Sequence, residues 1–172
     1  MMTKSKGHSD GLKVRGFFRV QLTEDGKGVI GDSGWKENKI TNLGIKEYIV
    51  TWLLSGAGGK YVTHMQLGTG TAPASNATSL NGEITGTAGG GAGSARLAVS
   101  SSLVDSGTAQ FTGGFASANS FVTQTENISN IGLFNTNTIG VGTLFAGNTF
   151  ASSSCATNQS VNATYQIRFV SA

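Results

Sequence analysis

Very few side chains in this 172-residue sequence could take part in acid–base, nucleophilic or metal chemistry. There are two histidines, His8 near the N-terminus and His64 in a strand-like stretch, and one cysteine, Cys155, among Ser, Thr and Asn residues. An enzyme needs acids, bases or nucleophiles held beside one another. A lone histidine in a strand is usually structural, and no basic residue adjoins Cys155 to lower its pKa. These residues do not predict a catalytic site.

The acidic residues and the glycine patterns lead to the same expectation. Beyond position 60 the only acidic residues are Glu83, Asp105 and Glu126, and their spacing does not by itself bring carboxylates together. The stretch Gly68-Thr69-Gly70 follows a strand, as a phosphate loop does, but no helix and no lysine come next. A single cysteine excludes an intrachain disulfide and a thiolate metal cluster. We therefore expect a non-enzymatic protein without catalytic, cofactor-binding or metal-binding residues.

Charge is scarce and unevenly distributed. Only 12% of residues are charged, about half the usual share of ~25%. Residues 1–60 hold ten of the twelve basic residues, whereas residues 61–172 hold two basic and three acidic residues. A monomer with so little charge would be poorly protected against self-association, so we expect a homo-oligomer, most simply a trimer. The alternative is a surface kept wet by hydroxyl and amide groups.

The chain shows no membrane or export signal. No apolar run approaches the ~20 residues of a membrane span, and residues 1–10 lack the apolar stretch of a signal peptide. We expect a protein that is made and kept in a cytosol and does not enter a membrane.

The first part of the chain predicts an arm followed by a basic hairpin. Residues 1–12 have no hydrophobic period and are expected to be a flexible arm. From Lys13 onward apolar and polar residues alternate, and Asp25-Gly26 is a turn signal before a returning strand. The outward face carries Lys13, Arg15 and Arg19, which we interpret as a surface for docking on an acidic protein. A merely solvated strand face is the alternative, and the small charge excess makes nucleic acid a disfavoured partner.

One helix is predicted after this hairpin. Asn42 is the expected N-cap and Gly56 the expected C-terminal cap. A single apolar stripe follows at helical spacing and supplies the expected core anchors: Ile45, Tyr48, Ile49, Trp52 and Leu53. If Trp52 is fully buried, Trp52→Ala should cost ~3–5 kcal/mol.

The rest of the chain predicts strands and turns. The strands are expected over Tyr61–Leu67, Arg96–Val104, Thr108–Phe115, Ser120–Thr125, Ile128–Phe134, Thr143–Ala146 and Ser160–Val170. Residues 68–94 are expected to be mostly loop, including the glycine-rich run Gly86–Ser94. Short strands punctuated by turns favour a mainly β fold, an antiparallel β-sandwich of jelly-roll type with one α-helix, as a single domain over residues 13–172.

Three stretches resemble small virion structural proteins of tailed bacteriophages. One is Val62–Pro73, which contains Gly68-Thr69-Gly70-Thr71 and is followed by Thr78, Leu80 and Glu83. The second is Ile128–Phe134, then Gly142–Phe150 and the closing strand Val161–Phe169. The third is the lead Asn38, Thr41, Asn42 and Gly44 before the helix. Asn130 stands where an acidic residue is common and Gly147 where a basic one is common, so stacking or an asparagine-mediated bond is expected in place of an ion pair.

The resemblance implies a structural role in a virus particle. Members of this group decorate capsids or belong to tails and fibres. We favour a capsid decoration (cement) protein, a homotrimer bound to the major capsid protein, over a tail or fibre component. A carbohydrate-binding module is a third possibility, because jelly rolls often bind sugars; Trp35, Trp52 and Tyr61 would then be the stacking residues.

Overall fold

The computed structural model describes residues 11–55, 58–85 and 95–171, and the chain over these residues is mainly antiparallel β-sheet. The predicted arm therefore lies outside the described residues except at its end, as do Gly56 and the run Gly86–Ser94. The described strands are β1 (Leu12–Glu24), β2 (Gly28–Asp32), β3 (Lys36–Ile40), β4 (His64–Gly68), β5 (Leu97–Ala98), β6 (Ser100–Asp105), β7 (Thr108–Phe115), β8 (Glu126–Phe134), β9 (Leu144–Cys155) and β10 (Gln159–Ser171).

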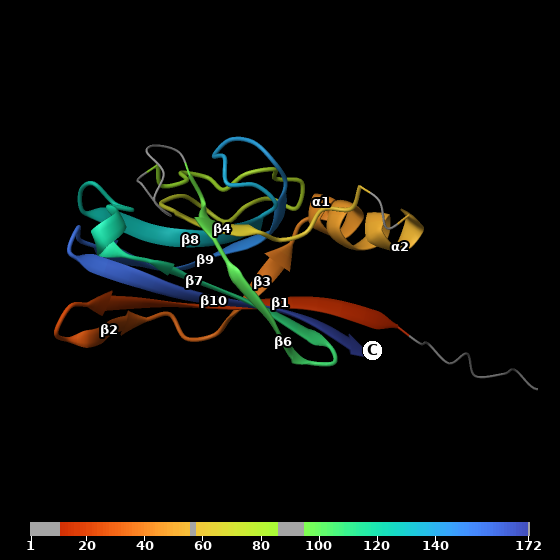
Figure 1. Cartoon of the computed structure of the whole chain (residues 1–172), viewed down its shortest axis with the longest axis horizontal. Coiled ribbons are helices and arrows are strands. Elements are labelled where there is room, and N and C mark those ends of the chain that lie inside the picture. Colours follow the sequence, from red (N-terminus) through yellow and green to blue (C-terminus); the bar gives the residue numbers. More distant parts are fainter. Residues whose placement is uncertain (1–10, 56–57, 86–94, 172) are drawn as a thin grey trace, which may run out of the picture.

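The strands form one sheet that is nearly closed into a barrel (Figure 1). Its order is β5-β4-β8-β9-β3-β1-β10-β7-β6, and β2 pairs with β1 beside this path. The two edge strands β5 and β6 follow each other in the chain, so this segment crosses from one edge of the sheet to the other. The mainly antiparallel β prediction is confirmed.

The longest pair of neighbouring strands in the barrel is β1 with β10. The strands pair without interruption from Leu12 opposite Ser171 to Glu24 opposite Gln159. Strand β1 thus begins at Leu12, one residue inside the predicted arm. The predicted alternation is confirmed in the middle of both strands, because Phe18, Val20 and Tyr165 point into the core and are almost fully buried. Phe18 stacks on Tyr165 with 5.8 Å between ring centroids.

The predicted helix forms, with a different cap and a different pitch. It comprises α1 (Asn42–Gly44), a π-helical turn η1 (Ile45–Val50) and α2 (Thr51–Ser55). The N-cap is Thr41 rather than Asn42: its hydroxyl accepts a hydrogen bond from the Gly44 amide at 2.8 Å and donates one to the Leu144 carbonyl at 2.6 Å. The cap therefore also ties the helix to β9.

Three of the five predicted core anchors are wrong. Tyr48 is buried and Ile49 is half-buried, but Ile45, Trp52 and Leu53 are 44%, 47% and 81% exposed. The stripe was drawn at 3.6 residues per turn, whereas a π-helical turn closes i→i+5 bonds and is wider. Each residue after η1 is therefore rotated away from the face that Tyr48 buries, and Trp52 is not the fully buried anchor that a ~3–5 kcal/mol loss on truncation would require.

The structure corrects three other predictions and confirms one strand as predicted. Residues Ser120–Thr125 form no strand and follow the short 3-10 helix η2 (Ser117–Asn119) instead. Tyr61 lies before β4 and is 67% exposed. Strand β9 extends far beyond Ala146, so Cys155 ends a strand rather than lying in a loop. The strand predicted over Thr108–Phe115 is confirmed without change.

Candidate interaction surfaces

The described side chains that could take part in acid–base, nucleophilic or metal chemistry are dispersed over the barrel. Among residues 11–55, 58–85 and 95–171, no group of three His, Cys, Asp or Glu side chains could hold a metal ion. Nδ1 of His64 lies 2.7 Å from the Thr63 hydroxyl, and burial lowers the pKa of His64. Asp105 accepts the Gly107 amide in the β6–β7 turn, which lowers the pKa of its carboxyl group. Glu126 accepts a hydrogen bond from Gln124 at the start of β8.

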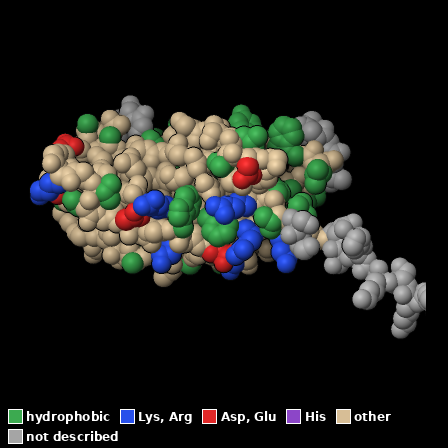
Figure 2. Space-filling model, turned by 90° about the horizontal axis from the view of Figure 1, so that it is seen from below, with side chains coloured by type: hydrophobic (Ala, Val, Ile, Leu, Met, Phe, Trp, Pro, Cys, Tyr) green, Lys and Arg blue, Asp and Glu red, His purple; other side chains and the backbone are tan. Residues whose placement is uncertain are grey.

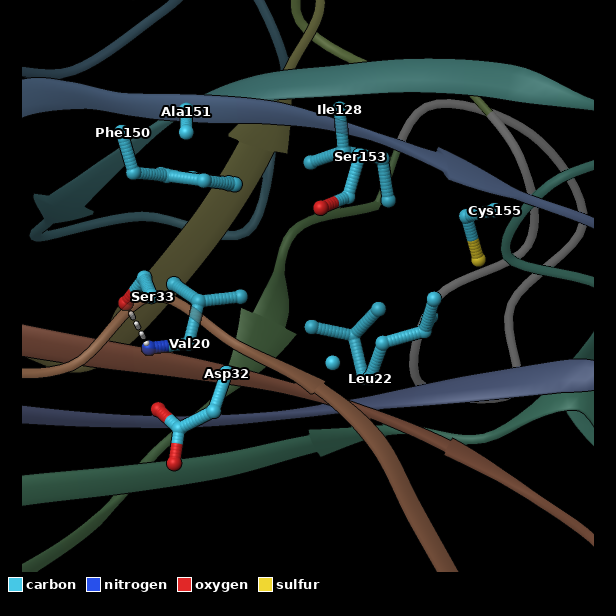
Figure 3. A pocket seen from close by; sticks show the side chains of 11 residues that line it. Val20, Leu22, Asp32, Ser33, Ile128, Phe150, Ala151, Ser153 and Cys155 are labelled. Carbon is cyan, nitrogen blue, oxygen red and sulfur yellow. Dashed lines mark hydrogen bonds between the residues drawn. The ribbon is translucent and has the colours of Figure 1, made fainter.

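Cys155 lies in a narrow apolar cleft between β9 and the β1–β2 hairpin (Figure 3). The cleft is lined by apolar side chains that include Leu22, Ile128 and Phe150, and Ser33 accepts the Val20 amide at its rim. Burial raises the pKa of the Cys155 thiol to about 11. At neutral pH the sulfur is therefore a protonated thiol, which is the unreactive form.

This environment predicts slow labelling of Cys155. The pKa rises from 9.0 to about 11, so at pH 8 the thiolate fraction should be about 100-fold below that of an ordinary cysteine. We expect iodoacetamide to react with the folded protein at least 100-fold more slowly than with the chain in guanidinium chloride. Mass spectrometry of the alkylated protein over time measures both rates, and equal rates would show that Cys155 is accessible.

A buried ion pair joins Glu83 to Arg96, and sequence reasoning missed it. The two side chains are 5% and 0% exposed, and the guanidinium donates to both carboxylate oxygens at 3.0 Å. Arg96 also donates to the carbonyls of Thr136 and Val141, and its guanidinium lies 3.6 Å from the centroid of the Phe134 ring. These contacts satisfy both charges inside the protein, and the pair holds loops together.

The other motif residues also have structural roles. Asn130 is fully buried and its side-chain amide donates to the carbonyls of Thr71 and Asn81, at 3.2 and 2.8 Å. Of the two alternatives expected at this position, stacking and an asparagine-mediated bond, the structure shows the asparagine-mediated bond. Gly68 gives Asn130 its room, because a Cβ at position 68 would lie 2.3 Å from the Asn130 side-chain oxygen. The stretch Gly68-Thr69-Gly70 is therefore packed closely over β8.

The predicted basic residues of β1 are largely paired inside the molecule. Arg15 bonds Glu37 at 2.9 Å and Arg19 forms an ion pair with Asp32, which strongly lowers the pKa of that carboxyl group. Lys13 is exposed and has no carboxylate partner among the described residues. Figure 2 shows Lys and Arg side chains beside Asp and Glu on this face of the sheet. Of the three predicted cations, the described residues thus leave only Lys13 without a carboxylate partner.

β10 adds a cation that the sequence analysis did not place here. Arg168 lies opposite Arg15 in the β1–β10 register, and both guanidinium groups lie over the Phe17 ring, at 4.7 and 5.2 Å from its centroid. Arg168 is exposed and bonds Gln166 rather than an acid. Lys13 and Arg168 are therefore the cations of this face that remain available to a partner.

An apolar groove opens where the helical segment meets β7 and β10. Its walls include Trp52, Tyr61 and Phe169, which are 47%, 67% and 38% exposed. The Trp52 indole donates to the Lys60 carbonyl at 3.1 Å, which orients the ring. Trp35, the third aromatic residue considered for sugar stacking, lies between β2 and β3 and does not line this groove. Within the described part of the chain, the groove and the basic face are two surfaces that could bind a partner.

Comparison with known proteins adds no relative. No protein-family model, no curated protein and no solved structure matches this chain. Within the described residues, the helices are all too short or too polar to pass through a lipid bilayer.

Proposed function

We propose that this protein is a non-enzymatic structural component of a tailed-bacteriophage particle, most specifically a capsid decoration (cement) protein. In this proposal it is made in the host cytoplasm and binds the assembled shell as a homotrimer, with the major capsid protein as its partner. One observation carries the proposal: a weakly charged body exposes a groove lined by aromatic side chains, and the exposure of such apolar surface to water is unfavourable. Such a surface fits repeated protein–protein contact.

The roles of the motif residues support the same proposal. Glu83, Asn130 and Thr41 bind main-chain groups or a buried partner, and each holds a loop or a helix against the barrel. They are among the residues on which the resemblance to phage virion proteins rests, and the contacts of all three are structural. The jelly-roll type predicted from the sequence is part of this proposal, and the antiparallel strands of the nearly closed barrel support it.

Attachment to the shell is assigned to the basic face of the sheet. The residues proposed from the sequence were Lys13, Arg15 and Arg19, and the internal pairing of the two arginines shifts the emphasis to Lys13 and Arg168. Each exposed pair with a shell carboxylate would contribute only ~0–1 kcal/mol. Many copies bound through a trimer could still attach firmly, because linked weak contacts multiply.

Occupancy on particles tests this assignment. The double variant K13E/R168E should bind to particles that lack the protein at least tenfold more weakly than wild type, measured by quantitative gel analysis of pelleted particles. The matched control is K27E/K46E, which changes the net charge by the same amount at Lys27 in the β1–β2 turn and at Lys46 in η1. Equal weakening of both double variants would mean that only net charge matters. Undiminished binding of K13E/R168E would place the attachment surface elsewhere.

A tail or fibre component is the alternative within the same class. Both roles predict binding to particles, and they differ in where the protein lies. Electron microscopy of particles carrying the labelled protein distinguishes a shell-wide distribution from one confined to the tail. A carbohydrate-binding module would have no requirement for particles, and glycan-array binding abolished by Trp35→Ala would favour it.

A further inference from the structure

The apolar surface at the helical end is large for a protein of this size. Trp52, Tyr61 and Phe169 line one groove and are 47%, 67% and 38% exposed. With roughly 200 Å² of surface for each aromatic side chain, they leave about 300 Å² of aromatic surface in water. Figure 2 shows hydrophobic side chains gathered at this end of the molecule. Apolar patches that reach ~300–600 Å² usually mark a binding site.

A second apolar feature protrudes beside the groove. Leu53 on α2 is 81% exposed, more than any other large hydrophobic residue described. Ile45 and Val50 of η1 are also exposed, at 44% and 40%. Figure 1 shows the helical segment projecting from the end of the barrel, so Leu53 lies on a projection and not on a flat wall. The molecule therefore carries a convex and a concave apolar surface at one end.

The chemistry of the groove favours an apolar protein side chain as its occupant. The one charged residue among its lining residues is Lys60, and its ammonium group is already bound to Glu47 and Thr143. A charged or strongly polar ligand would thus find no free partner of opposite charge there. An aliphatic side chain gains from leaving water in proportion to the area it buries. Leu53 is the most exposed such side chain on this molecule.

We propose that Leu53 of one copy inserts into the groove formed by Trp52, Tyr61 and Phe169 of a second copy. The contact is proposed as head-to-tail, with each copy giving its Leu53 to one neighbour and its groove to another, and repetition of a head-to-tail contact closes a ring when the rotation allows it. A three-membered ring would be the trimer of the proposed function. This inference deepens that proposal by naming the contact between copies, and rests on it only for the number of subunits.

Two single variants and their mixture test the contact. L53D removes the protruding side chain and Y61D places a charge in the groove wall; both positions are well exposed, so both variants should fold. We expect wild type to sediment at three times the 17.6 kDa chain mass at micromolar concentration. Each variant alone should sediment as a monomer, with self-association weakened about thirtyfold or more. Leu103→Asp is the matched control, because Leu103 is 76% exposed on β6 and does not line the groove.

The mixture tests whether Leu53 and the groove are the two halves of one contact, and the mass of the wild-type oligomer separates a three-membered ring from a symmetric dimer. Y61D keeps the protruding Leu53, and L53D keeps an intact groove. An equimolar mixture should therefore form a 1:1 dimer and stop there, because the two remaining surfaces are both defective. Wild type that stays monomeric at 100 µM, variants that associate like wild type, or a mixture that stays monomeric would each overturn the proposal. Since these measurements use the isolated protein, a trimer that fails to bind particles would count against the proposed function alone.

Discussion

Replacing Arg96 by leucine is expected to lower the free energy of unfolding by about 3–5 kcal/mol, because it leaves Glu83 as an unpaired carboxylate in the interior. The same change removes both hydrogen bonds to the carbonyls of Thr136 and Val141. It also removes the cation that lies over the Phe134 ring. Chemical denaturation at pH 7, with the midpoint and slope compared to wild type, measures the loss.

The chain supplies a matched control in the exposed pair Arg15–Glu37. It has similar bonding at 2.9 Å, but its side chains are 50% and 61% exposed. Arg15→Leu should therefore cost less than about 1 kcal/mol. The double variant R96L/E83L should recover part of the loss caused by R96L, since it leaves no isolated charge. Similar losses for R96L and R15L would show that burial of the Glu83–Arg96 pair does not determine its contribution.

Gly44→Ala is expected to destabilise the protein by about 2–3 kcal/mol, although the same change inside a helix normally stabilises by ~0.5–1 kcal/mol. A Cβ at position 44 would lie 2.1 Å from the carbonyl oxygen of Phe145 and 2.9 Å from its carbonyl carbon. Those atoms belong to the backbone of β9, so the helix itself must move away. The movement would stretch the two Thr41 hydrogen bonds that join the cap to Gly44 and Leu144. Thermal and urea unfolding measure the change.

Gly31→Ala serves as the control for this substitution. Gly31 lies in β2, and a Cβ there would meet only the Leu22 side chain at 3.4 Å, an ordinary contact. Its substitution should change the free energy of unfolding by less than about 1 kcal/mol. If Gly44→Ala proves neutral or stabilising, the helix does not depend on close approach to β9. The glycine in the lead to the helix would then have no packing role.

The strands were predictable where a period of two residues runs over a long stretch. β7 and β10 begin and end within one residue of the predicted positions, and Phe18, Val20 and Tyr165 point inward as the alternation requires. β9 was underestimated because its second half, Ala151–Ser154, is a run of small polar residues with no alternation. Such a run becomes a strand through pairing with β8, which no local pattern reveals.

The helix shows where periodicity misleads. Its position follows from the local sequence, but the π-helical turn between Ile45 and Val50 changes the direction of every later side chain. Tyr48 remains inside, with its hydroxyl bound to the Thr143 carbonyl, whereas Trp52 and Leu53 emerge into solvent. The stripe that looked like one buried face is divided between a core contact and an exposed surface.

By itself, the sequence determined the β class, the hairpin, the helix and the scarcity of reactive groups, because these follow from composition and from neighbours a few residues apart. Only the tertiary structure decided which charged side chains form ion pairs and which apolar side chains remain exposed to solvent. Arg15 meets Glu37 and Arg96 meets Glu83 only after the barrel has brought distant strands and loops together. Contacts of that kind depend on the register of the strands and on the path of the loops, and the residue types alone specify neither.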